Sequence, residues 1–223
     1  MEKTYTIKIH QLSKQFKETR ALSNINLEFE GGNIYGIVGR NGYGKTVLLK
    51  FICGLLYPND GDVSINHKII GKDVDFYDGI GFIIENPGFL YQYSGYKNLK
   101  MLAGLKKKVT KDTIKNWMNK VGLNPDNRKP VAKYSMGMKQ RLGWAQVLME
   151  EPGIIVLDEP FNGLDENGVE MFRKLLMNLK KEGRLILLCS HSREDIQLLC
   201  DMIIRLDQGE IVEIIHSENK VKL

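Results

Sequence analysis

The sequence predicts an α/β fold in which a buried parallel sheet is joined to an antiparallel β portion and an inserted helical segment. Short, continuously apolar runs, as at residues 34–38 and 154–157, are typical of strands buried on both faces of a sheet. Runs near the N-terminus alternate apolar and polar residues with period two, as half-buried strands do. Between residues 96 and 150 no strand pattern is present, and apolar residues recur at helical spacing.

The first part of the chain predicts mainly strands. Gly31 and Gly32 turn the chain into a buried strand, and the nearly all-apolar run after the next turn predicts an enclosed helix at residues 47–56. Pro58 and Gly61 end this helix. The predicted strands are residues 5–9, 25–29, 34–38, 63–65 and 80–84.

The second part predicts helices, followed by alternating strands and helices. Met138 and Met149 bound a helical face, and Lys180 and Gly183 close an amphipathic helix. The predicted helices are residues 98–105, 113–121, 138–149 and 169–179, and the predicted strands are residues 154–157, 185–189, 203–206 and 211–215. The last two strands read as a terminal hairpin.

The composition is that of a globular protein and argues against a nucleic-acid-binding, membrane-spanning or secreted protein. The 223 residues suffice for one large domain or two small ones, with 43% hydrophobic and 26% charged residues. The net charge of +5 is mild and the lysines are scattered, so we expect no nucleic-acid partner. No apolar run approaches the ~20 residues of a membrane span, and the N-terminus lacks a signal-peptide pattern. The three separated cysteines predict reduced core residues in a cytosolic protein.

The most specific motif is the octapeptide GRNGYGKT at residues 39–46, a G-x-x-x-x-G-K-[ST] phosphate loop between a predicted strand and a predicted helix. Its glycines let backbone N–H groups converge on a phosphate, and the helix adds its positive N-terminal end. Lys45 can reach the outer phosphates, and Thr46 offers a hydroxyl to Mg²⁺. The motif predicts binding of a nucleoside triphosphate.

Two adjacent carboxylates, Asp158 and Glu159, end the predicted strand 154–157. Paired acids at the end of a buried strand are costly without a cation or an acid–base task. Asp158 is placed to hold the Mg²⁺ shell. The alternative, a plain surface turn, is disfavoured by the four preceding apolar residues and by the phosphate loop upstream.

A third element, YSMGMKQR at residues 134–141, begins a predicted helix. Ser135 is a good helix N-cap, which is a sufficient structural reason for its presence. The same geometry also presents a hydroxyl, backbone N–H groups and a helix dipole to a phosphate.

With these elements in place, the chain resembles the nucleotide-binding subunits of ATP-binding cassette (ABC) transporters from end to end. Residues 134–141 match the family signature, usually LSGGQ followed by a basic-Gln-Arg run, and the order of the other family motifs also matches. The resemblance implies a RecA-like phosphate-loop NTPase core with an antiparallel β portion and an inserted α-helical subdomain. It implies a single domain over residues 1–223, with the core at 1–95 and 151–223 and the helical subdomain at 96–150.

The resemblance also implies roles for individual residues. Glu159 would be the general base or water-positioner, His191 the switch histidine that holds the γ-phosphate and the attacking water, and Asp165 the anchor of the D-loop at residues 162–165. Phe16 stands where the family places an aromatic residue on adenine, although it could equally be a core residue. The implied ATP-binding residues are Phe16, Gly39, Asn41, Gly42, Gly44, Lys45, Thr46, Ser135 and Gly137, and the implied Mg²⁺ ligands are Thr46, Asp158 and Glu85.

Two departures from the family pattern point to one branch of the family. Met136 and Met138 replace the first glycine and the glutamine of the signature, and Glu85 stands at the position of the Q-loop glutamine. These features together are similar to the branch associated with bacitracin resistance and lantibiotic immunity.

The implied function is ATP-driven pairing, as a homodimer or with another ABC subunit, which drives a transmembrane permease. Residues 85–96 would help to dock the permease, the cargo would be a peptide antibiotic or another amphipathic compound, and the subunit would lie on the inner face of the membrane, bound only through the permease. A soluble ABC ATPase acting on nucleic acid or ribosomes, a phosphate-loop kinase and a subunit that binds ATP without hydrolysis are the alternatives. Glu159 and His191 argue against the last of these.

Overall fold

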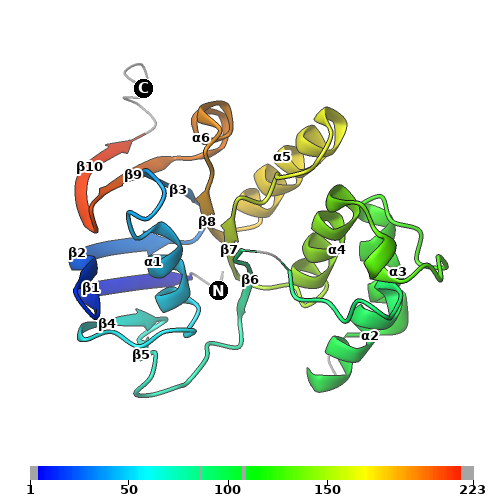
Figure 1. Cartoon of the computed structure of the whole chain (residues 1–223), viewed down its shortest axis with the longest axis horizontal. Helices are drawn as coiled ribbons and strands as arrows, with labels where there is room; N and C mark the ends of the chain where they lie inside the picture. The colour runs from blue at the N-terminus through cyan, green and yellow to red at the C-terminus, as the bar shows by residue number, and fades with distance from the viewer. Residues whose placement is uncertain (1–4, 86, 107–108, 217–223) are drawn as a thin grey trace.

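A computed structural model describes residues 5–85, 87–106 and 109–216, and it places two sheets beside an arm of helices (Figure 1). The smaller sheet is antiparallel, in the order β2-β1-β4-β5. The larger sheet has the order β10-β9-β3-β8-β7-β6, and all its pairs are parallel except the hairpin of β10 with β9. The α/β class with an antiparallel portion is therefore confirmed.

The strands of the smaller sheet are β1 (Thr6–Phe16), β2 (Thr19–Glu30), β4 (Asp60–Ile65) and β5 (Lys68–Ile69). Those of the larger sheet are β3 (Ile34–Val38), β6 (Ile80–Ile83), β7 (Ile154–Asp158), β8 (Leu185–Cys189), β9 (Met202–Asp207) and β10 (Glu210–His216). The helices are α1 (Lys45–Ile52), α2 (Gly95–Lys106), α3 (Lys111–Lys120), η1 (Val131–Lys133, a 3₁₀ turn), α4 (Met136–Leu148), α5 (Glu166–Lys181) and α6 (Arg193–Leu199).

The central strands bring their C-terminal ends to one edge of the larger sheet. In this sheet Ile37 of β3 and Asp158 of β7 both pair with Cys189 of β8. The chain therefore leaves three neighbouring strands at the same level, and it enters the phosphate loop, the acidic turn and the turn at His191. This is the edge at which parallel α/β sheets bind ligands.

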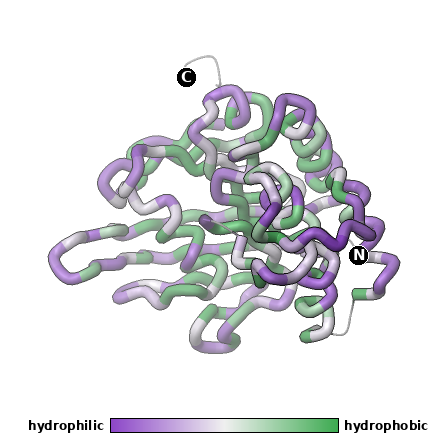
Figure 2. Tube along the Cα trace, turned by 45° about the vertical axis from the view of Figure 1, so that its right-hand side comes forward, coloured by the Kyte–Doolittle hydropathy of each residue, from purple (hydrophilic) through white to green (hydrophobic). Residues whose placement is uncertain are grey.

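Alternating residues of the central strands divide the core between the two faces of the larger sheet. Ile154 and Val156 of β7 belong to a cluster that includes the smaller sheet and α1. Ile155 and Leu157 belong to a second cluster that continues into α2, α3 and α4. In the tube view the interior strands are mostly hydrophobic and the peripheral loops mostly hydrophilic (Figure 2).

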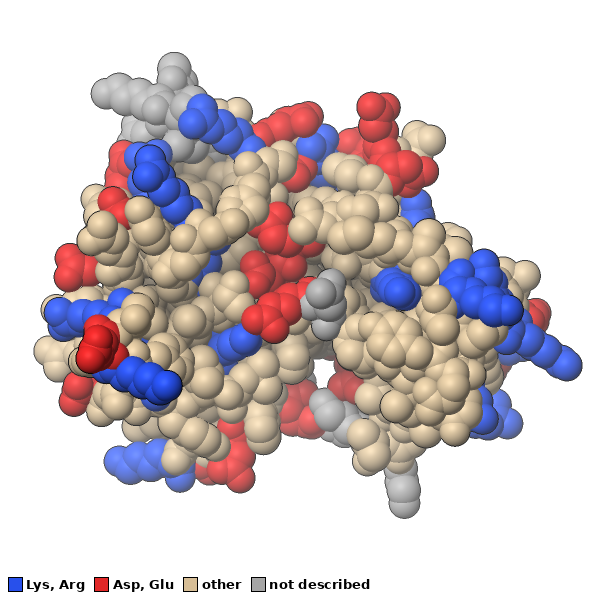
Figure 3. All heavy atoms as spheres, viewed as in Figure 1, with Lys and Arg blue, Asp and Glu red and all other residues tan. Residues whose placement is uncertain are grey.

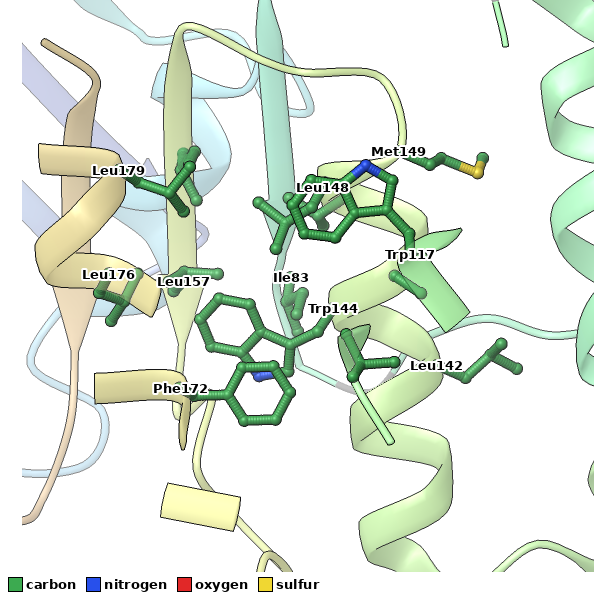
Figure 4. Packing of buried hydrophobic residues seen from close by; sticks show 14 of the residues in the cluster. Ile83, Trp117, Leu142, Trp144, Leu148, Met149, Leu157, Phe172, Leu176 and Leu179 are labelled. Carbon is green, nitrogen blue, oxygen red and sulfur yellow. The ribbon is translucent and has the colours of Figure 1, made fainter. Parts of the chain in front are cut away.

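We call α2, α3, η1 and α4 the helical arm. Its packing centres on Trp144 of α4, which is fully buried and stacks on Phe172 of α5 with ring centroids 4.3 Å apart (Figure 4). The arm therefore shares its hydrophobic core with the sheet through α5. None of the helices in the described part of the chain is both long and apolar enough to cross a bilayer.

Most predicted elements are confirmed, with shifts at their ends. The strands at residues 34–38 and 185–189 have the predicted bounds, whereas β1 and β2 are longer than their short alternating patterns. The helix predicted at residues 47–56 begins earlier and ends earlier, as α1. Three short elements, β5, η1 and α6, were not predicted, because two to seven residues carry too little periodicity to be read.

Candidate nucleotide-binding site

The phosphate loop joins β3 to α1 in a conformation that requires glycine at its end. Gly44 occupies the N-cap position of α1 with φ +94°, and a Cβ there would lie 2.5 Å from the carbonyl oxygen of Ala21. The loop therefore packs tightly on β2, and its backbone N–H groups lie at the start of a helix, where an anion is favoured.

Lys45 is folded back into this loop. Its side chain is buried, with 7% of the residue exposed, and Nζ donates hydrogen bonds to the carbonyl oxygens of Gly39 (2.7 Å) and Arg40 (3.1 Å). A buried ammonium group is costly unless its donors are satisfied, and here the loop itself satisfies two of them. These two hydrogen bonds hold the positive charge inside the loop. The third N–H of the ammonium group can donate to a phosphate oxygen.

Thr46 and Asp158 meet across the sheet edge. The Thr46 hydroxyl donates a 2.8 Å hydrogen bond to Oδ2 of Asp158, and Asp158 is buried. A hydroxyl and a carboxylate are hard oxygen donors of the type that Mg²⁺ takes together with substrate phosphates. The donor set therefore fits Mg²⁺, and the predicted pair of ligands is brought together.

Glu159 and His191 flank the same point. Nε2 of His191 lies 3.5 Å from Oε1 of Glu159, yet this buried oxygen makes no hydrogen bond in the described structure. Burial raises the pKa of the Glu159 carboxyl, the charge of His191 opposes the rise, and neighbouring Asp158 adds to it. A buried carboxylate oxygen that makes no hydrogen bond suits a group that accepts a proton from water.

These groups surround an open cavity of about 320 Å³. The lining residues are Asn41, Gly42, Gly44, Lys45, Thr46, Val47, Asp158, Glu159 and His191. Acidic side chains gather at the centre of the molecular face, between the sheets and the helical arm (Figure 3). Four predicted roles (phosphate, metal, base and switch) thus converge on one place.

The predicted signature residues lie elsewhere. Ser135 is the N-cap of α4, where its Oγ accepts a 3.2 Å hydrogen bond from Met138 N, and neither Ser135 nor Gly137 lines the cavity. A Cβ on Gly137 would lie 2.6 Å from the carbonyl oxygen of Gly163. Gly137 therefore has a packing role inside the chain that sequence reasoning did not anticipate.

Phe16 and Glu85 also stand apart from the cavity-lining residues. Phe16 is 43% exposed at the end of β1, so its interpretation as a core residue is wrong, and its place on adenine stays a prediction. Oε1 of Glu85 lies 2.7 Å from Nζ of Lys50 on α1, and the Glu85 side chain is 63% exposed. Its role as a metal ligand stays a prediction.

Sequence reasoning missed the polar contacts that join the helical arm to the site. Arg141 of α4 donates to Oδ1 of Asp165 (2.9 Å), and the same oxygen caps α5 by accepting from Gly168 N. Gln140 and Trp144, also of α4, both donate to the residue that follows Glu159. Only the basic-Gln-Arg run at residues 139–141 hinted at these contacts, because their partners lie on another element.

Comparison with known proteins gives a consistent result. The profile of a protein family described as "ABC transporter" matches residues 22–162. An uncharacterized ABC transporter ATP-binding protein, YybJ of Bacillus subtilis, is 42% identical, over 92% of this chain and 94% of its own length.

Two further relatives carry names that refer to transport. The bacitracin transport ATP-binding protein BcrA of Enterococcus faecalis is 40% identical, over 94% of this chain and 68% of its own length. The lantibiotic transport ATP-binding protein SrtF of Streptococcus pyogenes is 35% identical, over 92% and 89%. The dimeric structure of MJ0796, a bacterial ABC transporter cassette, matches the fold with a TM-score of 0.86 at 24% identity, covering 95% of this chain and 98% of its own.

Proposed function

Because the chain belongs to the ABC transporter family and is an ATP-driven transporter subunit, we propose that it works as one half of a pair that binds two ATP molecules and drives a permease. The observation that carries the proposal is the convergence of Lys45, Thr46, Asp158 and Glu159 at one sheet edge. Lys45 and Thr46 arrive there at the start of α1, and Asp158 and Glu159 arrive at the end of β7.

The geometry of each residue supports the task that we propose for it. Lys45, already held inside the loop, binds the outer phosphates. Thr46 and Asp158 hold Mg²⁺, which neutralises charge that develops on the phosphates. Glu159 accepts a proton from the attacking water through its unpartnered oxygen, and His191 holds the water and the γ-phosphate beside it.

The pair arises because the cavity is open and the signature turn lies outside it. We propose that Ser135 and Gly137 of one copy close the cavity of the other, since a helix N-terminus offers N–H groups and a favourable dipole to phosphate. The same-fold cassette described as dimeric agrees with this arrangement.

The permease docks on the arm side of the molecule in this proposal. Leu90 and Tyr91, which precede α2, are exposed, as are Met101 and Leu105 on α2 itself. Exposed apolar side chains on a helix and on the segment that leads into it suit a protein partner. The subunit then lies on the inner face of the membrane through the permease alone.

The proposed cargo is a peptide antibiotic or another amphipathic compound, moved outward. This proposal is supported by two relatives, BcrA and SrtF, whose names refer to bacitracin and lantibiotic transport. A non-transport ABC ATPase that acts on nucleic acid is not favoured, because the net charge of only +5 is carried by scattered lysines.

The Glu159→Gln variant tests the assigned chemistry. It should bind ATP normally but hydrolyse it roughly 10²- to 10⁴-fold more slowly, because a positioned general base is lost. Phosphate release and nucleotide affinity are measured on the same preparation. Glu166→Gln, an exposed change in the first turn of α5, is the matched control and should retain wild-type turnover. Near-normal hydrolysis by Glu159→Gln would contradict the assignment.

The same variant has a signature that does not depend on activity. The folded-state pKa of Glu159 is raised, so the ionised carboxylate destabilises the folded chain at neutral pH. Glu159→Gln should therefore raise the melting temperature of the nucleotide-free protein near pH 7. The gain should vanish as the pH falls below the ordinary carboxyl pKa, where Glu159 is protonated in both folded and unfolded chains.

A further inference from the structure

The carbonyl group of Pro160, directly after Glu159, accepts two hydrogen bonds from the helical arm. Nε2 of Gln140 donates at 2.8 Å and Nε1 of Trp144 donates at 3.1 Å. Both donors are buried and lie four residues apart on α4, so they share one helix face. We call this double contact the Pro160 clamp.

The clamp uses the only backbone hydrogen-bonding group that Pro160 has. Proline carries no N–H, and its ring fixes φ, so the carbonyl oxygen alone can tie this residue to the rest of the chain. Two donors occupy both of its lone pairs. The position of the Pro160–Phe161 peptide, one residue beyond Glu159, is therefore set by α4.

The Trp144 donor is itself held in place. Its indole ring stacks on Phe172 of α5, with centroids 4.3 Å apart and planes at 18° (Figure 4). The ring also stacks on Phe161, with centroids 6.4 Å apart. The ring is completely buried. Trp144 therefore transmits the position of α4 rather than adapting to it.

Glu159 needs such support. Its φ is +50°, in the left-handed region that a side chain disfavours, and its own N–H donates to the carbonyl oxygen of Cys189 (2.9 Å). The residue is thus fixed on one side by β8 and on the other by the clamp. Sparsely populated backbone conformations persist where the surrounding structure determines them.

We propose that Gln140 and Trp144 are positioning residues for Glu159, and that the clamp carries movement of α4 to the carboxylate. The proposal rests on the base role assigned to Glu159 above. The signature turn, Ser135 to Gly137, begins the same helix. When this turn engages a nucleotide of the partner copy, α4 is displaced, and the clamp passes the displacement to Glu159 of its own site. Each site is thereby made sensitive to occupancy of the other.

Trp144→Phe separates positioning from packing. The substitution keeps an aromatic ring on Phe172 and removes the N–H donor together with part of the buried ring, and the control below matches that loss of ring volume. We expect kcat to fall about tenfold, since small misplacements of a reacting group are costly, while the ATP dissociation constant stays within about twofold. Trp117→Phe on α3 is the matched control, because Trp117 is the only other tryptophan of the chain and contacts Lys120 instead. It should retain wild-type kcat.

A second variant guards against misfolding. Gln140→Met keeps the length of the side chain and removes the other donor, so it should lower kcat in the same way. Both substitutions together should cost less than the product of their separate effects, because they act on one carbonyl. Circular dichroism and thermal melting of every variant verify the fold.

The Glu159→Gln background shows whether the clamp acts through the base. With the carboxylate gone, Trp144→Phe should reduce the residual single-turnover rate no further. An equal reduction in both backgrounds would identify a purely structural role and overturn the inference. If Trp144→Phe and Gln140→Met both hydrolyse ATP at the wild-type rate while Glu159→Gln is inactive, the clamp does not position Glu159, and the proposed function stands. If Glu159→Gln itself hydrolyses normally, the base assignment fails, and the clamp inference fails with it.

Discussion

The two halves of the proposed nucleotide site differ in how far the single chain completes them. At the sheet edge, the functional groups bind one another: Lys45 donates to its own loop, and Thr46 donates to Asp158. At the start of α4, Ser135 accepts a hydrogen bond from Met138 N of its own helix, and the neighbouring Met136 is 60% exposed. The groups at the sheet edge are held in place by hydrogen bonds within the chain, so they can bind a ligand without a partner. The exposed start of α4, in our proposal, binds a nucleotide only when a second copy brings one to it.

The difference has a physical origin in the two scaffolds. β3, β7 and β8 each have a hydrogen-bonded strand on both sides, so the residues at their ends are fixed with little freedom. The signature turn stands at the end of a helix whose position depends on side-chain contacts such as Arg141 with Asp165. Side-chain contacts can rearrange more easily than a strand ladder. We therefore expect any rearrangement on pairing to occur in the arm, at its polar contacts, rather than at the sheet edge.

The largest effect on this comparison is expected from Ser135→Asp. Aspartate caps a helix as well as serine does, so α4 should remain stable. Its carboxylate would nevertheless face the partner's γ-phosphate, and like charges placed together cost several kcal/mol. ATP-driven pairing, measured by light scattering in the Glu159→Gln background, should be lost, while ATP binding by the single subunit is kept.

Ser135→Asn is the control for this change, because it preserves the cap without adding charge. It should pair nearly as well as the parent protein. If Ser135→Asp pairs as tightly as Ser135→Asn, the signature turn does not face a nucleotide, and the second half of the site has been assigned to the wrong surface.

Lys45→Ala should act on the other half. A hydrogen bond from a charged donor is worth ~1.5–3 kcal/mol, so ATP affinity should fall roughly 10- to 100-fold. Calorimetry on the unpaired subunit isolates this effect from pairing. Lys68→Ala, an exposed change on β5, is the control and should leave affinity unchanged. Equal affinities of Lys45→Ala and the wild type would show that the loop binds phosphate through its backbone alone.

The same contrast explains what could be read from the sequence. The sheet-edge half is encoded locally, because a strand, a glycine-rich turn and a helix start follow one another within residues 34–46. Asp158 and Glu159 could be placed because the C-terminal ends of parallel strands meet at one edge.

The arm half could be named but not positioned from the sequence. Gln140 and Trp144 lie one helical turn apart, and nothing in the local sequence indicates that both reach the carbonyl of Pro160. Gly137 was assigned to phosphate binding alone, whereas its approach to Gly163 also requires the missing side chain. Such tertiary contacts depend on how two elements pack, which a one-dimensional pattern does not specify.

Substitution of Glu85 is expected to have the smallest effect on folding stability but a clear effect on the coupling of ATP hydrolysis to the permease. Glu85 forms an ion pair with Lys50 of α1, 35 residues away in sequence. Exposed pairs of this kind are worth only about 0–1 kcal/mol, so Glu85→Gln should barely change the melting temperature. ATP affinity should change little, while stimulation of the ATPase by the permease should change clearly, because Glu85 precedes the exposed residues of the proposed dock.

Lys50→Gln decides which of two roles Glu85 has, because it breaks the same ion pair from the opposite side. If the pair itself holds the loop in place, Lys50→Gln and Glu85→Gln should alter permease stimulation alike. If Glu85 leaves the pair to bind Mg²⁺, Lys50→Gln should free the carboxylate, and less Mg²⁺ should be needed for half-maximal ATPase activity. Glu85→Gln should instead raise the Mg²⁺ concentration that is needed. Magnesium titrations of ATPase activity for both variants, with and without the permease, distinguish these outcomes. No change in either variant would make Glu85 a surface residue of the turn, and the loop would then couple the two halves through its apolar side chains alone.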